Sequence, residues 1–277
     1  MRGSCTDAGR CRAKGAIVAL ALVSLAPPVS AEGVGLYLWE LGKQSVSGAD
    51  RLADETVAVV LEVRDPQEVA SRIGSAATLD VIAIDLSSIT VRSRSTDSIR
   101  GGPGAATSAS SFIIDYEEPA ISDLLAGWQR TSAAPLTPEE LRAFVYGHVA
   151  EKTYLRGYDV ASRVAETGSG DCTEHAFLLA ALARAEGYPA RVVLGILLHA
   201  AGDEVQAFGH AWTEIHDGTD WQRHDATLPA ESMPGEWLRY LPLMPVVNEG
   251  ISYQMGLFEI ATLWPSAVRV VPGAGGP

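Results

Sequence analysis

Short apolar runs rich in valine and isoleucine recur through the first half of the chain, separated by polar and glycine-rich stretches. Such runs are typical of β-strands, which are short and favour β-branched residues. They predict strands at 57–63, 79–86, 89–93 and 111–116. Residues 100–110 are rich in glycine, alanine and serine and predict a loop. We therefore expect residues 32–120 to form a β-rich N-terminal region.

The apolar period becomes helical after Leu136. Thr137, Pro138 and Glu140 provide an N-cap, a first-turn proline and the glutamate of a capping box. The apolar residues that follow share one helical face: Leu141, Phe144, Val145 and Val149. A second short helix is predicted at 160–165, and the glycines of 168–170 end it.

Residues 171–187 give the clearest helix prediction. Asp171 is a good N-cap, Glu174 completes a capping box, and Gly187 is a natural stop. Because the helix is apolar on nearly every side, we expect it to be buried. A buried strand is predicted at 191–198, and two more strands follow it.

These two strands should form a hairpin around Asp217-Gly218, which is a strong two-residue turn signal. In that register His210 lies directly opposite Asp225, close enough for the carboxylate to hold the imidazole. Trp212 faces Arg223, a cation–π arrangement. A one-residue slip would break the His210–Asp225 pairing, whereas a two-residue slip would leave the two residues diagonal.

Residues 1–31 have the layout of a secretory signal peptide. A basic start precedes the apolar run 16–26 and the small-residue end Val29-Ser30-Ala31. The alternative is a membrane anchor, but the run has roughly 11 residues and a span needs about 20. We expect cleavage after Ala31 and export to the periplasm or beyond the cell, which leaves a chain that is not embedded in the membrane.

Charge and cysteine content sharpen this interpretation. The net charge of -13 becomes about -16 without residues 1–31, which argues against a chain held to nucleic acid by charge. The same cleavage removes Cys5 and Cys11 and leaves Cys172 alone. A lone thiol in an exported protein is either a small buried hydrophobe or a nucleophile.

The predicted position of Cys172 favours a nucleophile. In the first turn of a helix, the free N–H groups and the helix dipole stabilise a thiolate. The same N–H groups can receive an oxyanion. His210 would act as the base and Asp225 as its orienting group.

Other interpretations of the polar residues remain. The His210–Asp225 pair alone is equally consistent with an ordinary cross-strand contact. His175 is three residues from Cys172 and is interpreted as supporting or structural, and no motif surrounds His148 or His199. A zinc site from Cys172, His210 and His216 lacks short ligand spacing, and no calcium-loop pattern is present, so no metal or cofactor is predicted.

Three blocks, in order, resemble the core of the transglutaminase-like superfamily. They are Gly170–Ala176 with Leu182–Val193, then Gly209–Glu214, then Asp225–Thr227. Cys172, His210 and Asp225 stand 38 and 15 residues apart in these blocks. The resemblance covers roughly residues 120–230, less than half of the chain.

This resemblance implies a papain-like α+β fold, with a nucleophile helix packed on an antiparallel sheet. It implies Cys172 as nucleophile, His210 as general base and then acid, Asp225 as orienting group, and acyl chemistry on an amide through a thioester. The animal members cross-link glutamine to lysine, require calcium and carry β-sandwich domains that cannot fit here. The chain looks closer to the compact prokaryotic members, many of which act as peptidases or amidases.

We therefore predict a signal peptide at 1–31, the β-rich region at 32–120 and a catalytic domain at 121–277. The predicted function is an exported cysteine-dependent enzyme that hydrolyses a peptide or glutamine-type amide or transfers its acyl group to an amine. Trp212 is predicted to line the substrate site, and the substrate is a protein or peptide, with a cell-wall peptide as the narrower option. The rival prediction is an inactive binding module of the same fold.

Overall fold

A computed structural model describes ten stretches of the chain: 39–45, 56–73, 79–94, 98–99, 101–128, 135–152, 159–229, 236–246, 248–253 and 263–271. The predicted signal peptide at 1–31 lies outside these residues. Within them, no helix is both long and apolar enough to span a membrane.

A long antiparallel hairpin forms the centre of the fold. Its strands are β6 (Ala190–Ala201) and β7 (Glu204–His216), paired along their whole length. The six-stranded sheet built on it has the order β5-β8-β7-β6-β9, with β1 also paired to β7. The remaining strands of this sheet are β1 (Trp39–Ser45), β5 (Ser98–Ile99), β8 (Trp221–His224) and β9 (Glu236–Pro245).

Strand β7 carries two short partners on one edge, because β6 occupies the other. Strand β1 pairs with residues 204–209 and β8 pairs with residues 213–216. Residues 210–212 thus face a gap between β1 and β8 in the described part of the sheet.

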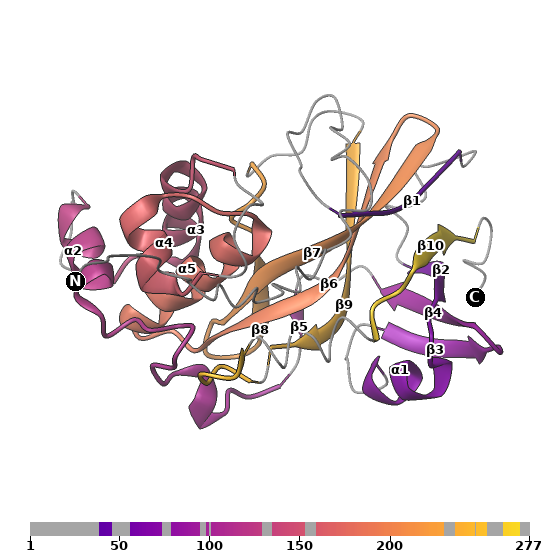
Figure 1. Ribbon diagram of the computed structural model, residues 1–277, viewed down its shortest axis with the longest axis horizontal. Helices are drawn as coiled ribbons and strands as arrows, with labels where there is room; N and C mark the ends of the chain where they lie inside the picture. The colour runs from indigo at the N-terminus through magenta and orange to yellow at the C-terminus, as the bar shows by residue number, and fades with distance from the viewer. Residues whose placement is uncertain are drawn as a thin grey trace, which may run out of the picture.

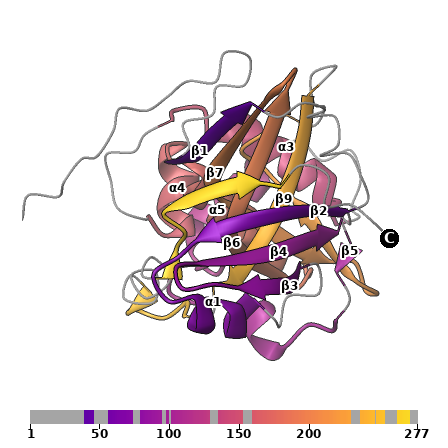
Figure 2. The same ribbon diagram turned by 90° about the vertical axis from the view of Figure 1, so that its right-hand side faces the viewer.

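A second, four-stranded sheet has the order β10-β2-β4-β3. Its strands are β2 (Thr56–Glu62), β3 (Leu79–Ile84), β4 (Ser88–Arg94) and β10 (Ala267–Val270), and α1 (Pro66–Ile73) packs beside β3. Figure 2 shows these strands crossing the steeply inclined strands β6, β7 and β9 behind them. The two sheets enclose one core, which includes Leu61, Val91, Ile196 and Leu198.

The other helices gather at the opposite end of the central hairpin (Figure 1). They are α2 (Pro119–Gly127), α3 (Pro138–His148), α4 (Ala161–Thr167) and α5 (Cys172–Ala185), and a 3-10 turn, η2, spans Ala105–Thr107. Helix α5 packs on β6 and β7, and α2, α3 and α4 cover its outer sides. This second core includes Phe177, Leu179, Val192 and Ala211.

The sequence predicted most of these elements. The strands expected at 57–63, 79–86 and 89–93, the three helices after residue 136, and the strand from 191 are confirmed within a few residues. The capping boxes of α3 and α5 form as expected. Strands β1, β9 and β10 were not individually predicted.

The strand expected at 111–116 is wrong. Ser111 and Ile114 instead close a tight turn, with Ser111 N–H donating to Ile114 O at 3.1 Å. Ile113 and Ile114 are fully buried in the second core, while Asp115 accepts hydrogen bonds from Ser162. The segment is apolar because it fills a core, not because it belongs to a sheet.

The predicted α+β class, with a nucleophile helix packed on an antiparallel sheet, is confirmed. The boundary near residue 120 stays a prediction, and strands from both sides of it share both sheets. Strands β1 and β5 join the six-stranded sheet, and β10 pairs with β2.

Candidate functional site

Cys172 is the first residue of α5, where the sequence predicted it. The Asp171 side chain accepts a hydrogen bond from Thr173 N–H at 2.8 Å, and Glu174 accepts one from Asp171 N–H at 2.9 Å. Gly170 precedes the cap with φ +157°, and a Cβ there would lie 2.3 Å from the Glu174 Cβ. The glycine therefore allows the capping box to close against the chain before the helix.

The Cys172 sulfur lies at the gap in the edge of β7. The backbone N–H of Ala211 donates a hydrogen bond to it. The side chain is partly buried and contacts the core beneath α5 as well as the cluster of Leu197, Phe208 and Leu228. Cys172 is therefore fixed between its helix and the residue that follows His210.

These surroundings correct one expectation. Burial and the neighbouring Asp171 carboxylate raise the pKa of the Cys172 thiol well above its ordinary value, and the Ala211 N–H opposes this only in part. A helix N-terminus was expected to favour the thiolate, but desolvation outweighs it. The resting thiol is neutral, so its ionisation requires a base that takes the proton. The positive charge that the base then carries stabilises the thiolate.

His210 and Asp225 are in direct contact. His210 Nε2 lies 2.6 Å from Asp225 Oδ2, and both side chains are buried. Because Nε2–H donates to the carboxylate, the other nitrogen of a neutral ring is an acceptor. That Nδ1 atom is buried and has no hydrogen-bond partner in the described structure.

Asp225 is held by further groups that the sequence did not point to. Tyr240 O–H donates to Oδ2 at 2.8 Å, and Thr227 N–H donates to Oδ1 at 2.8 Å. Burial raises the pKa of Asp225, but the charge and hydrogen bond of His210, with these two donors, outweigh it and lower the pKa to about 2. The carboxylate is therefore ionised at neutral pH.

Arg142, on α3, supports the loop that carries Asp225. Its Nη1 donates to Leu228 O at 3.1 Å and to Asp225 O at 3.4 Å, and the side chain is buried. The loop is thereby tied to the helical side of the molecule.

The predicted hairpin register is wrong by two residues. His216 pairs with Trp221 and Glu214 with Arg223, so the turn contains four residues instead of two. Asp217 causes the wider turn, because its carboxylate accepts from Thr219 N–H and Asp220 N–H at 2.8 and 2.9 Å. Asp225 lies diagonal to His210 and still reaches it.

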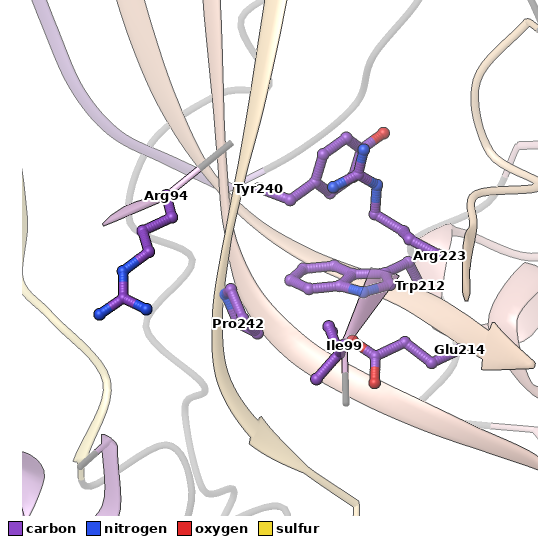
Figure 3. A pocket seen from close by; sticks show the side chains of 7 residues that line it. All are labelled: Arg94, Ile99, Trp212, Glu214, Arg223, Tyr240 and Pro242. Carbon is purple, nitrogen blue, oxygen red and sulfur yellow. The ribbon is translucent and has the colours of Figure 1, made fainter. Parts of the chain in front are cut away.

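Trp212 lies on the same face of the sheet as His210, with ring centroids 6.2 Å apart. The predicted stacking of Arg223 on Trp212 is wrong: Arg223 lies over the Tyr240 ring, 3.9 Å from its centroid, because the shifted register places it there. Figure 3 shows these side chains around a pocket whose lining comprises Arg94, Ile99, Trp212, Glu214, Arg223, Tyr240 and Pro242. Trp212 is only 2% exposed, so its substrate-binding role stays a prediction.

The other histidines lie outside this cluster or support it. His175 is fully buried and contacts Lys152, and His216 contacts the backbone of Gly101 and the ring of Trp221. No group of three or more potential metal ligands occurs among the described residues. Of the residues that sequence reasoning missed, Tyr240 and Arg142 gave no local signal, whereas Lys152 is one of only three lysines in the chain.

Residues 129–226 match the family model of the transglutaminase-like superfamily. This segment contains Cys172, His210 and Asp225, and the match confirms the resemblance found in the sequence. No curated protein matches the chain.

Two solved structures are similar to parts of the chain. A proposed cysteine protease from Cytophaga hutchinsonii is 14% identical, with 73% of this chain and 78% of that chain covered and a TM-score of 0.41. The periplasmic domain of TgpA from Pseudomonas aeruginosa, bound to ethylmercury, is 21% identical, with coverage of 50% and 55% and a TM-score of 0.33.

Proposed function

We propose that this chain, which contains a transglutaminase-like core, is a cysteine-dependent enzyme that acts on a peptide or glutamine-type amide through a thioester. One observation carries the proposal. The imidazole of His210 is oriented by Asp225 through Nε2, its Nδ1 is left without a partner, and the next residue on the strand contacts the Cys172 sulfur.

The first step follows from the protonation states. The Cys172 thiol is neutral at rest, so its proton passes to His210 Nδ1 as the sulfur attacks the amide carbon. Asp225 stabilises the imidazolium because its lowered pKa keeps it ionised. The Cys172 backbone N–H, in the first turn of α5, receives the oxyanion, because the Thr173 and Glu174 N–H groups already donate to the Asp171 side chain.

Collapse of this intermediate releases the amine, which takes its proton from His210, and leaves a thioester on Cys172. His210 then activates water or a second amine to cleave the thioester. Hydrolysis and acyl transfer differ only in which nucleophile reaches the thioester carbon. We propose an exported protein acting on a protein or peptide, with cell-wall peptide as the narrower substrate.

The test combines variants with a thiol-directed probe that mimics an amide. Cys172→Ala and His210→Ala should each abolish labelling, and Asp225→Ala should cost less because its role is orientation. His216→Ala is the matched control, since His216 is also a buried histidine of β7 but lies outside the cluster. Full labelling of the His210 variant would exclude this mechanism.

A wild-type chain that never reacts at Cys172 near neutral pH would instead favour a binding module of the same fold. For a reactive chain, mass spectrometry of a thioester trapped on Cys172 from a lysate would identify the acyl donor. Digestion of isolated cell-wall material would separate a wall-peptide hydrolase from a general protein amidase.

A further inference from the structure

Lys152 lies beside the start of the nucleophile helix, although it is 20 residues earlier in the sequence. The residue before it, Glu151, forms a parallel bridge with Ser169. Glu151 N–H donates to Gly168 O at 3.2 Å, and Gly170 N–H donates to Glu151 O at 3.0 Å. These bonds fix the backbone next to Lys152 against the segment that leads into α5.

His175 holds the Lys152 ammonium group. The histidine lies one turn after Cys172 on α5 and is fully buried. Its Nδ1 lies 2.5 Å from Asp171 O, so Nδ1 carries the proton and Nε2 is an acceptor. Lys152 Nζ donates to that Nε2 across 2.6 Å. Burial, together with the Lys152 charge, lowers the pKa of His175 to about 4, which keeps the ring neutral.

A neutral imidazole holds the ammonium group without cancelling its charge. An ammonium group has three N–H donors, and His175 uses one of them. Two donors and a full positive charge therefore remain for another acceptor.

The groups that act on this charge come from two sides. Asp171, Cys172 and His175 belong to α5 and its cap, and Asp225 belongs to the loop after β8. Burial lowers the pKa of Lys152, although Asp225, Cys172 and Asp171 all oppose this. Lys152 thus interacts electrostatically with both the proposed nucleophile and the acid that orients its base.

We propose that Lys152 is a further catalytic residue, whose ammonium group donates a hydrogen bond to the oxyanion formed when Cys172 attacks an amide carbonyl. The inference rests on the proposed function. As the S–C bond forms, the π electron pair of the carbonyl moves to oxygen, where Lys152 and the Cys172 backbone N–H receive the negative charge. When the C–N bond breaks, that pair reforms the carbonyl and His210 protonates the amine. Lys152 keeps its proton throughout.

Two reactions of Cys172 separate this role from activation of the thiol. Acylation by p-nitrophenyl acetate passes through an oxyanion, whereas alkylation by iodoacetamide does not. In Lys152→Met, acylation should fall about 10²–10³-fold, the effect of losing one oxyanion donor, while alkylation stays within about threefold of wild type. Lys152→Arg should restore part of the acylation rate. Lys43→Met is the matched control, because Lys43 is an exposed lysine of β1 that pairs with Glu204 of β7.

Three results would overturn the inference. The first is unchanged acylation in Lys152→Met, and the second is an equal loss of alkylation and acylation in that variant. If Lys152→Met does not unfold cooperatively, Lys152→Gln replaces it, and full acylation in Lys152→Gln is the third. A wild type that is alkylated at Cys172 but never acylated would instead count against the proposed function itself.

The pH profile gives an independent readout in folded protein. In the wild type, the ratio of acylation to alkylation should fall at alkaline pH as Lys152 loses its proton, at a lower pH than for an ordinary lysine. Lys152→Arg should remove this fall, because arginine stays protonated. A fall that persists in Lys152→Arg would contradict the role of Lys152.

Discussion

Asp225 is a buried carboxylate that remains ionised because both of its oxygens accept hydrogen bonds. His210 and Tyr240 donate to one oxygen and Thr227 N–H to the other. Its negative charge therefore fixes the His210 ring and favours the imidazolium that forms when Cys172 loses its proton. This one group links folding stability to the proposed chemistry.

The linkage predicts how stability depends on pH. The folded pKa of Asp225 is about 2, below its ordinary 3.8, so its stabilisation is complete above the ordinary value and is lost as pH falls towards 2. Asp225→Asn should lack this loss, which amounts to about 2 kcal/mol. Urea unfolding at several pH values between 5 and 2 measures it. Asp123→Asn, at an exposed position of α2, should keep the wild-type slope. A wild-type slope in Asp225→Asn would show that another group controls acid unfolding.

At the scale of single residues, the sequence identified the main cluster but not its electrostatics. Cys172, His210 and Asp225 could be selected because a capping box and a hairpin leave local signals. The raised pKa of Cys172 could not be predicted, since it depends chiefly on burial, to which residues of β6, β7 and the loop after β8 contribute. Tyr240 and Lys152 are brought to the site by tertiary contacts alone.

At the scale of elements, the approach of β6, β7 and β9 depends on one glycine. Gly195 pairs with His210 on β7 and with Pro242 on β9. A Cβ at this position would lie 2.2 Å from Leu241 O and 2.4 Å from Cη2 of Trp212. The absent side chain is what allows the Trp212 ring to lie across β6 beside His210.

Gly195→Ala should therefore destabilise the fold by about 1–3 kcal/mol, because neither a backbone oxygen nor a buried indole can move easily. Urea unfolding measures the change. Gly147→Ala is the control: this glycine lies in α3 with open space around it, and alanine there should stabilise the helix by up to about 1 kcal/mol. Equal stability of Gly195→Ala and wild type would mean that the strands can separate without cost.

The loop that carries Asp225 depends on α3 through Arg142. Arg142→Met should leave the carbonyls of Asp225 and Leu228 without this donor and shift the carboxylate. Turnover should fall about ten- to hundredfold, as expected for a small displacement of a catalytic group, while alkylation of Cys172 by iodoacetamide persists. Arg163→Met, at an exposed arginine paired with Glu166, is the control. Unchanged turnover in Arg142→Met would assign the arginine to packing alone.

Element type was more predictable than element pairing. The valine-rich runs and capping boxes specify strands and helices locally, so β2, β4, α3 and α5 lie close to where they were expected. The Asp217-Gly218 pair predicts a turn of two residues, but the turn has four. The Asp217 carboxylate widens it by accepting hydrogen bonds from backbone N–H groups, which the pair alone does not indicate. Residues 111–116 were assigned to a strand because an apolar run by itself does not distinguish a strand from a buried turn.

At the scale of the whole molecule, the central hairpin belongs to both cores. Val192 and Leu194 of β6 pack beneath α5, whereas Ile196 and Leu198 of the same strand pack against the four-stranded sheet. The C-terminal strand β10 completes that second sheet by pairing with β2. Because both cores contain buried residues of the hairpin, unfolding of the hairpin would expose both. We therefore expect the described parts to unfold as one cooperative unit, although the sequence predicts a boundary near residue 120.

Leu61→Ala tests this directly, because Leu61 is fully buried in the first core, in the part of the chain that precedes residue 120. The variant should lose about 2–5 kcal/mol of stability. The urea midpoint measured by circular dichroism and that measured by alkylation of Cys172 should fall together, as they should in Leu141→Ala in the second core. Leu86→Ala, at a fully exposed leucine, should change neither midpoint. If the midpoint measured by alkylation of Cys172 stayed at its wild-type value in Leu61→Ala, the two cores would unfold independently of each other.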